Sequence, residues 1–262
     1  AETGIVATGA DETVTVTSLT GQLTVDDVIT TTSGNVELMA TAGALLIDAA
    51  VTTTAGTATL TAGTTITSTA AGTITTTGEN AADQGTAGGA VLLHSTGAGA
   101  ITLLGDITAS GGNTTAGTND GGDAGVITVR NDSGSILIDD VTATGGTSAG
   151  GTAGADGTIQ LSATTTIDQQ AATDITAAGG NLKLVSTGGD VTLNNVTNTV
   201  AIVAADLTGA SSLSYTDADG LSIGMIAQAG TGNAQLAAET GIVATGADET
   251  VTVTSLTGQL TV

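Results

Sequence analysis

The chain has 262 residues, of which 40 are glycine and one is tyrosine, and it has no proline, cysteine, tryptophan or phenylalanine. Its 25 acidic and 2 basic residues give a formal charge of -23, so it offers no basic stripe to nucleic acid. No apolar run approaches the roughly 20 residues that span a bilayer. These features exclude an aromatic-rich globular core, and we expect neither a nucleic-acid partner nor membrane insertion of this segment.

An exact internal repeat organises the chain. Residues 1–25 recur letter for letter as residues 238–262. We expect residues 1–237 to be one complete tandem repeat and residues 238–262 to be the start of the next identical repeat, in a continuous solenoid without an independent second domain. A fibre or a multivalent display gains length or avidity from every copy, whereas a catalytic domain gains nothing.

Segments with alternating residues predict the first strand of each coil. ETVTVTS (12–18) is followed by GNVELMA (34–40), GTATLTA (56–62), GAVLLHS (89–95), GVITVRN (125–131), GTIQLSA (157–163) and GNLKLVS (180–186). Two apolar columns result, one with Val36, Ala58, Val91, Ile127, Ile159 and Leu182, the other with Leu38, Leu60, Leu93, Val129, Leu161 and Leu184. The column between them is expected to face solvent: Glu37, Thr59, Leu92, Thr128, Gln160 and Lys183.

A second set of strands follows about nine residues later in each coil. Its inward pairs are Leu23 and Val25, Leu45 and Ile47, Ile101 and Leu103, Ile136 and Ile138, and Val191 and Leu193. A third short strand is marked by Val28, Val51, Ile107, Val141 and Val196. Three strands per turn predict a triangular coil.

The spacing of the segments predicts the fold class. The glycines that open the aligned segments are separated by 22, 33, 36, 32 and 23 residues. Short periods of this kind indicate a solenoid whose strands pair in parallel at about 4.8 Å. We predict an all-β, right-handed parallel β-helix (β-solenoid) with three short strands per coil and roughly 22 residues per coil with loop insertions. Residues 196–212 and 226–248 fit this frame poorly.

Three insertions follow the third strand in consecutive coils, at residues 78–88, 110–124 and 144–156. Since consecutive coils stack, these loops are expected to leave one corner side by side. Clustered loops on a rigid scaffold often bind partners, which makes their polar residues candidates for lateral self-association or for a cell-surface or glycan ligand: Glu79, Asp83, Asn113, Asp120, Asp123 and Asp156. The alternative is glycine-rich surface elaboration, because these loops lack the Tyr, Trp and Arg that anchor typical interfaces.

An aspartate column precedes the third strand at Asp106, Asp140 and Asp174. Stacked carboxylates either raise their pKa or gather a cation such as calcium, so calcium is the one cofactor that the sequence suggests. The alternative is that each aspartate accepts backbone N–H bonds at a turn. The calcium-binding nonapeptide of other β-helices is absent.

Catalysis is not expected, because the chain has one histidine, one arginine and one lysine and no convergent site. His94 and Arg130 fall in the same outward column of neighbouring coils. Asp217 and Asp219 form a pair in YTDADG that is better explained as a polar corner between strands. The chain is therefore predicted not to be an enzyme.

Segments such as GAITLLGDITASGGN, GSILIDDVTATGG and SLSYTDADGLSIG resemble the repeats of filamentous-haemagglutinin-type exoproteins and related giant bacterial surface adhesins. The resemblance implies a very large extracellular or cell-surface protein with a β-helical shaft, and the lack of cysteine fits this location. Two functions follow. The chain is a structural element of a fibre, with copies of its own repeat as partners, or it is the shaft of an adhesin that projects a binding tip or binds ligands many times over.

Overall fold

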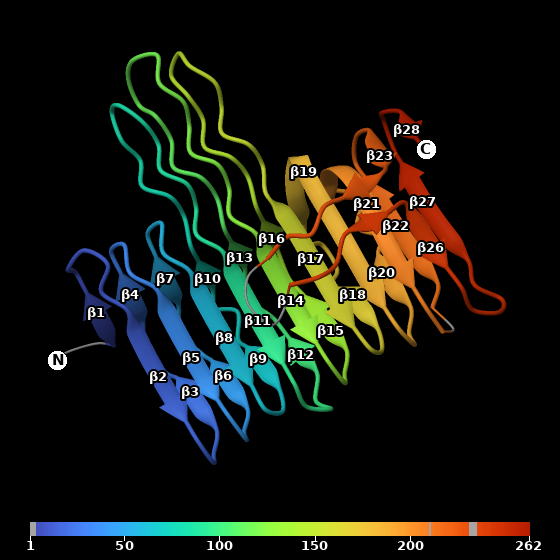
Figure 1. The fold of residues 1–262 in the computed structure, drawn as a ribbon, viewed down its shortest axis with the longest axis horizontal. Coiled ribbons are helices and arrows are strands. Elements are labelled where there is room, and N and C mark those ends of the chain that lie inside the picture. The colour runs from blue at the N-terminus through green and yellow to red at the C-terminus, as the bar shows by residue number, and fades with distance from the viewer. Residues whose placement is uncertain (1–3, 210, 231–234) are drawn as a thin grey trace.

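The computed structural model describes residues 4–209, 211–230 and 235–262. Residues 1–3 of the repeated sequence, and residues 210 and 231–234 of the two stretches that fit the frame poorly, lie outside this part. The described chain is all-β, and its strands are almost entirely parallel (Figure 1). They form one 17-stranded sheet, one 9-stranded sheet and one two-stranded sheet. No helix suited to crossing a bilayer occurs among the described residues.

The first series of parallel strands, here called the β2 ladder, contains the aligned segments of the sequence. It consists of β2 (Val14–Ser18), β5 (Val36–Ala40), β8 (Ala58–Ala62), β11 (Val91–Ser95), β14 (Ile127–Asn131), β17 (Thr158–Ala163) and the second halves of β19 (Ile175–Ser186) and β21 (Thr199–Leu207). The register confirms both predicted columns, since Leu38 pairs with Leu60 and Leu161 pairs with Leu184. Every residue of these two columns from Val36 onward is buried.

The second series, the β3 ladder, is the 9-stranded sheet. Its strands are β3 (Leu23–Val25), β6 (Leu45–Ile47), β9 (Ile66–Ser68), β12 (Ile101–Thr102), β15 (Ile136–Ile138), β18 (Ile167–Gln169), β20 (Val191–Leu193), β22 (Leu213–Asp217) and β27 (Val251–Ser255). The predicted inward pairs lie in register here as well, with Leu23 beside Leu45 and Ile101 beside Ile136.

The third series, the β1 ladder, consists of β1 (Ile5–Ala7), β4 (Ile29–Thr31), β7 (Val51–Thr53), β10 (Ile74–Thr75), β13 (Ile107–Thr108), β16 (Val141–Thr142) and the first halves of β19 and β21. Two predicted members of its inward column are wrong. Val28 is 40% exposed and Val196 is 61% exposed, whereas Ile29 and Val200 are buried. Each valine precedes its strand, and the pairing of Ile29 with Val51 sets the register.

The corners of the coils are tight. Glycine is required at Gly34, because a Cβ atom there would overlap the carbonyl oxygen of Glu12 in the adjacent coil. Buried hydroxyl and amide groups close the corners. The Thr31 hydroxyl donates to the Gly34 carbonyl (2.5 Å) between the β1 and β2 ladders, and the Asn131 amide donates to the Gly99 carbonyl (2.8 Å) between the β2 and β3 ladders. The polar backbone of the corners is therefore satisfied within the stack.

A hairpin interrupts the last coil. After β23 (Leu221–Ile223) the chain forms β24 (Met225–Ile226) and β25 (Glu239–Thr240), which pair antiparallel, and it then returns as β26 (Ile242–Ala244). The described residues of this hairpin, 225–230 and 235–240, fold back across the outer surface of the β2 ladder (Figure 1). At Gly230, a Cβ atom would lie 3.2 Å from both Gln160 Nε2 and Thr128 Oγ1.

This hairpin corrects one expectation from the sequence. Thr128, Gln160 and Lys183 point away from the core as predicted, but all three are buried rather than solvated. The ammonium Nζ of Lys183 has no hydrogen-bond partner among the described residues. Burial lowers the pKa of Lys183, and the nearby charge of Glu239 on the hairpin opposes that shift.

The second copy of the repeated sequence continues the stack. β26 pairs with β21, β27 pairs with β22, and β28 (Leu260–Thr261) pairs with β23, all in parallel. Residues 238–262 are thus part of the same solenoid-like body as the coils before them.

Candidate functional site

The three insertions lie side by side and project together from one corner, between the β1 and β2 ladders (Figure 1). We call residues 78–88, 110–124 and 144–156 the glycine blade. Hydrogen bonds link the outgoing arms of neighbouring loops, from Gly78 N–H to the Ser110 carbonyl (2.8 Å) and from Gly111 N–H to the Thr144 carbonyl (2.9 Å). The returning arms are linked in the same way, as where Ala124 N–H donates to the Ala155 carbonyl (2.9 Å).

Glycine allows the outgoing and returning arms to pack against each other as two layers. Gly122 N–H donates to the Gly112 carbonyl (2.9 Å), and Gly146 N–H donates to the Gly122 carbonyl (2.8 Å). A Cβ atom at Gly122 would overlap the carbonyl oxygen of Thr86, and one at Gly146 would overlap that of Gly112. The insertions are therefore an ordered element whose spacing depends on glycine.

Most of the predicted interaction residues hold the blade together. Their side-chain oxygens accept backbone N–H groups: Asn113 from Thr147 (2.7 Å), Asp120 from Thr152 (2.7 Å), Asp123 from Ala155 (2.8 Å) and Asp156 from Gly145 and Gly179 (both 2.6 Å). Glu79 and Asp83 lie exposed on the first loop. Asp120 and Asp123 are exposed as well, so the blade presents four of the predicted carboxylates to solvent.

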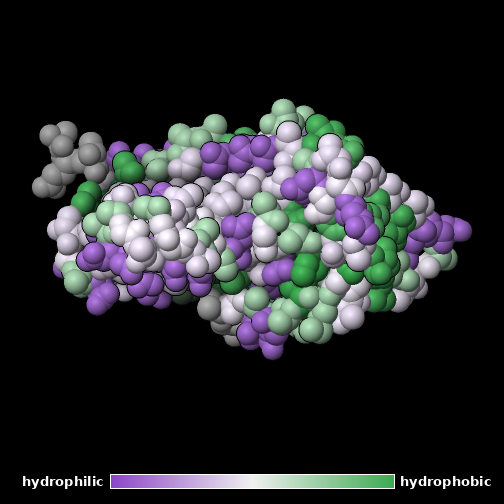
Figure 2. Space-filling model, turned by 90° about the horizontal axis from the view of Figure 1, so that it is seen from above, coloured by the Kyte–Doolittle hydropathy of each residue, from purple (hydrophilic) through white to green (hydrophobic). Residues whose placement is uncertain are grey.

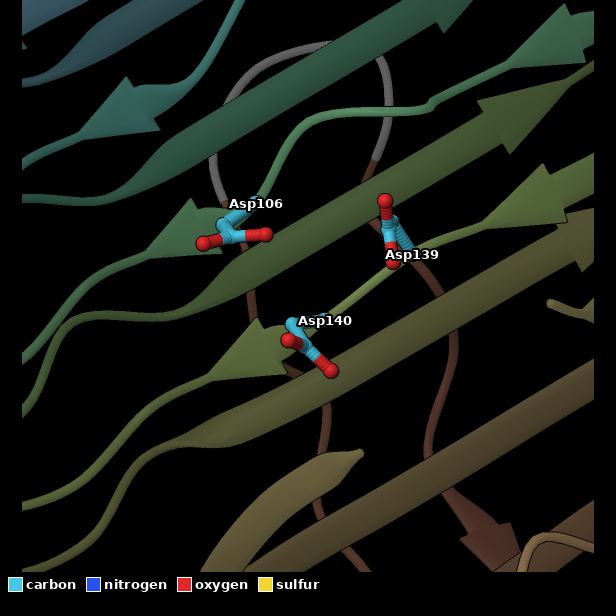
Figure 3. Close-up of side chains that lie close together, drawn as sticks. All are labelled: Asp106, Asp139 and Asp140. Carbon is cyan, nitrogen blue, oxygen red and sulfur yellow. The ribbon is translucent and has the colours of Figure 1, made fainter. Parts of the chain in front are cut away.

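The aspartate column meets in a different combination from the predicted one (Figure 3). One carboxylate oxygen from each of Asp106, Asp139 and Asp140 lies within 4.8 Å of the other two. Asp174 instead donates its backbone N–H to Asp140 Oδ1 (2.5 Å), which is the turn-capping arrangement. Burial raises the pKa of Asp139, and the charges of Asp140 and Asp106 raise it further. Carboxylate oxygens at this spacing suit a hard cation such as calcium.

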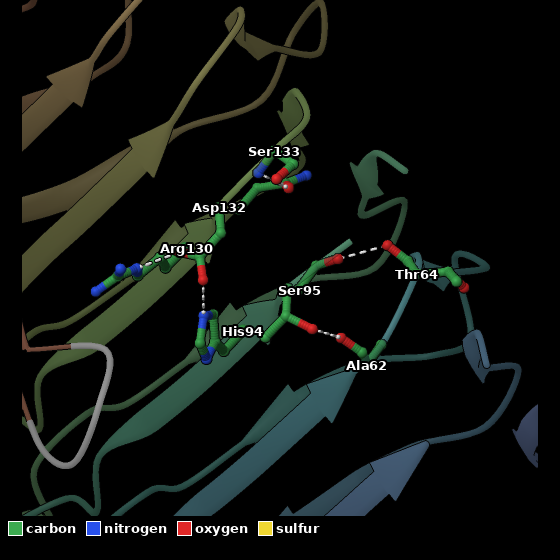
Figure 4. Close-up of polar contacts among 9 residues, drawn as sticks. Ala62, Thr64, His94, Ser95, Arg130, Asp132 and Ser133 are labelled. Carbon is green, nitrogen blue, oxygen red and sulfur yellow. Dashed lines mark hydrogen bonds and ion pairs between the residues drawn. The ribbon is translucent and has the colours of Figure 1, made fainter. Parts of the chain in front are cut away.

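The two basic residues of the outward column are joined by an aspartate (Figure 4). His94 and Arg130 lie in register on β11 and β14, as predicted. Asp132 bridges them, with Oδ2 2.9 Å from His94 Nε2 and Oδ1 accepting from Arg130 Nε (2.6 Å). Burial raises the pKa of Asp132, but the hydrogen bonds from His94 and Arg130 outweigh it, so the pKa lies below its usual value. Asp132 was not predicted from the sequence. The feature of the sequence that indicates this contact is its position just beyond β14, two residues after Arg130.

The single tyrosine and Asp217 form a buried polar pair. The Tyr215 hydroxyl donates to Asp217 Oδ2 (2.8 Å), which also accepts from Val200 N–H (3.0 Å). Asp217 Oδ1 accepts from Asp219 N–H (3.2 Å), so the YTDADG string is a polar corner. Burial raises the pKa of both Tyr215 and Asp217.

Comparison with known proteins adds no relative: no protein-family model, no curated protein and no solved structure matches this chain.

Proposed function

We propose that the chain is a non-enzymatic structural repeat of a giant extracellular bacterial protein and that its copies form a long β-helical surface fibre. One observation carries the proposal. Parallel pairing runs from the first repeat onto the second copy of its opening sequence without a break, through β21 with β26 and β22 with β27. Each further copy would lengthen the same stack, because solenoid repeats contact only their neighbours.

The proposed coil is right-handed and has three strands. The three ladders support this count, as does the offset of 22 residues between stacked positions such as Asn35 and Thr57. The handedness rests on the general rule for crossovers between parallel strands. The acidic surface of such a fibre would keep neighbouring shafts soluble and apart. The resemblance to filamentous-haemagglutinin-type repeats supports a location at the cell surface.

The length of the particle tests this function. Chains with one, two and three complete periods are imaged by electron microscopy, and the expected rods lengthen by the same increment with each period, at about 4.8 Å per coil. Compact particles whose longest dimension does not grow with the number of periods would refute the fibre.

The glycine blade favours a second candidate, in which the repeat is an adhesin shaft that binds surface ligands many times over. A polar element that projects from a regular stack, with Glu79 and Asp83 exposed at its first loop, is where a weak glycan or protein contact would form. Binding of the repeat to a glycan array and to bacterial cells is compared with that of a variant in which the three loops are shortened to corner turns. Loss of binding with unchanged shaft stability supports the adhesin, and equal binding rejects this surface.

A further inference from the structure

The same 25-residue sequence occurs twice in the structure, and its two copies lie in different ladders. The string VTVTS forms β2 in the 17-stranded sheet, whereas its copy forms β27 in the 9-stranded sheet. The string LTV forms β3 in the 9-stranded sheet, whereas its copy contributes β28 to the 17-stranded sheet. The string IVA pairs with β4 in the β1 ladder as β1 and with Ala205–Leu207 of the β2 ladder as β26.

We infer that successive repeats join with a shift of one strand position, so that one repeat does not contain a whole number of coils. β26 and β27 lie one ladder further along the coil than β1 and β2, and β28 stacks on β23 at the start of the next coil instead of in the β3 ladder. The inference rests on the three-strand coil proposed above, for which the shift amounts to one third of a turn. Three repeats would then return the chain to its starting orientation.

The hairpin is where the shift arises. Gly224 N–H donates to the Val203 carbonyl (3.2 Å), and Ala205 N–H donates to the Gly241 carbonyl (2.9 Å). The chain therefore leaves the β2 ladder at Gly224 and returns to the same ladder at Gly241, whose N–H donates to the Gly224 carbonyl (2.9 Å). As a result, the first strand of the second copy, β26, lies in the β2 ladder.

The first copy shows how the repeated sequence contacts the coil after it, and the second copy shows how it contacts the coil before it. In the first copy, Val14 pairs with Val36 of the following coil, and in the second copy the equivalent Val251 pairs with Leu213 of the preceding coil. Val14 is 8% exposed, but Val251 is 43% exposed. Exposed apolar side chains gather at this end of the molecule, toward the right of Figure 2, and they include Val243, Val251, Leu256 and Leu260.

In a chain with a further copy, the coil equivalent to residues 26–48 would cover this end face. In the first copy that coil provides β4, β5 and β6, which cover β1, β2 and β3. On the second copy the same three strands would cover β26, β27 and β28. They would stack in the shifted ladders, since the strands beneath them are already shifted.

The shift has a consequence for display. The glycine blade leaves the first repeat between the β1 and β2 ladders. In the next repeat it would leave at the following corner, so the blades of a long chain would point in three directions around the shaft. Such a fibre presents its blade to partners on every side rather than along one line.

Cysteine crosslinking in the 262-residue chain tests the shift, because the chain has no cysteine of its own. In the shifted arrangement Thr254 lies beside Thr216 in the β3 ladder. Without the shift, Thr254 would take the position in the β2 ladder that its equivalent Thr17 has in the first copy. The residues stacked in register on Thr17 in successive coils end with Val185 and Asp206, so Thr254 would then lie beside Asp206. The variants are Thr216→Cys with Thr254→Cys and Asp206→Cys with Thr254→Cys, both treated with a short thiol crosslinker and analysed by mass spectrometry.

A third pair separates failure of the shift from failure of the coil. Thr192→Cys with Ser214→Cys joins neighbouring coils inside the first repeat and should crosslink in any version of the β3 ladder. We expect efficient crosslinking of this pair and of Thr216 with Thr254, and at least tenfold less of Asp206 with Thr254. If the internal pair reacts but Thr216 with Thr254 does not, the shift is refuted. If the internal pair also fails, the stacked coil itself is refuted, and the shift with it.

Discussion

Truncation of Leu161 measures how much one coil depends on its inward column. Leu161 on β17 is fully buried between Val129 and Leu184, its partners in the adjacent coils. Leu161→Ala leaves a cavity that two rigid ladders cannot close, so we expect a loss of about 2–5 kcal/mol in the free energy of unfolding. For a chain of this size each kcal/mol lowers the melting temperature by roughly 2–4 °C, which gives a drop of roughly 4 °C or more.

Circular dichroism in the β-sheet region during thermal melting follows this loss, and hydrogen exchange locates it. Since each coil contacts only its neighbours, faster exchange should be confined to β14, β17 and β19. Leu256→Ala is the matched control, because Leu256 is 49% exposed and its truncation should change stability by less than about 0.5 kcal/mol. Equal effects of the two substitutions would refute the assignment of Leu161 to the core.

Three further changes address the blade, the hairpin and the aspartate cluster. Gly122→Ala should open the two layers of the blade, because its Cβ overlaps the Thr86 carbonyl; limited proteolysis should then cut the loops faster while the melting temperature of the shaft stays unchanged, and an uncut blade contradicts the close packing. Thr128→Asp should cost about 1–3 kcal/mol in a denaturant titration, because the charge is buried under the hairpin between the uncharged partners Leu92 and Gln160, whereas Thr52→Asp on β7, a half-buried position between Thr30 and Thr75, should cost less; equal losses would show that the hairpin does not cover this surface. The pKa of Asp139 is raised, so its ionisation destabilises the fold and stability falls as the pH rises through that pKa; Asp139→Asn should flatten this fall and gain up to about 1 kcal/mol at pH 7, and calcium should raise the melting temperature of the parent chain alone if it binds the cluster.

The stacking register could be read from the sequence because the inward columns obey simple rules. Val36, Leu38 and their equivalents alternate with polar residues, and a glycine marks each corner, so a one-residue slip would turn every apolar side chain outward. The sequence pattern of the β1 ladder, the third strand of each coil, is weaker. Its separate strands are only two or three residues long, and near Val28 and Val196 more than one apolar residue fits the pattern.

The environment of the outward column could not be read from the sequence. Gln160 and Lys183 alternate correctly with the core positions, but Gly230 and Glu239, from the hairpin far along the chain, lie against them. The same limit applies to the aspartates. Asp139 joins the cluster and Asp174 leaves it because of side-chain directions at a turn, and sequence spacing does not fix these directions.

The orientation of the strands has a mechanical consequence. In the proposed coil the strands lie across the long axis and the hydrogen bonds run along it, so a pull on the two ends would load the coils in series and open them one at a time. The 22 residues of a short coil, such as those from Asn35 to Gly56, would extend from about 4.8 Å in the stack to about 75 Å as a stretched chain. A fibre of this kind would lengthen many times over before its backbone came under tension, and it would absorb energy at each step.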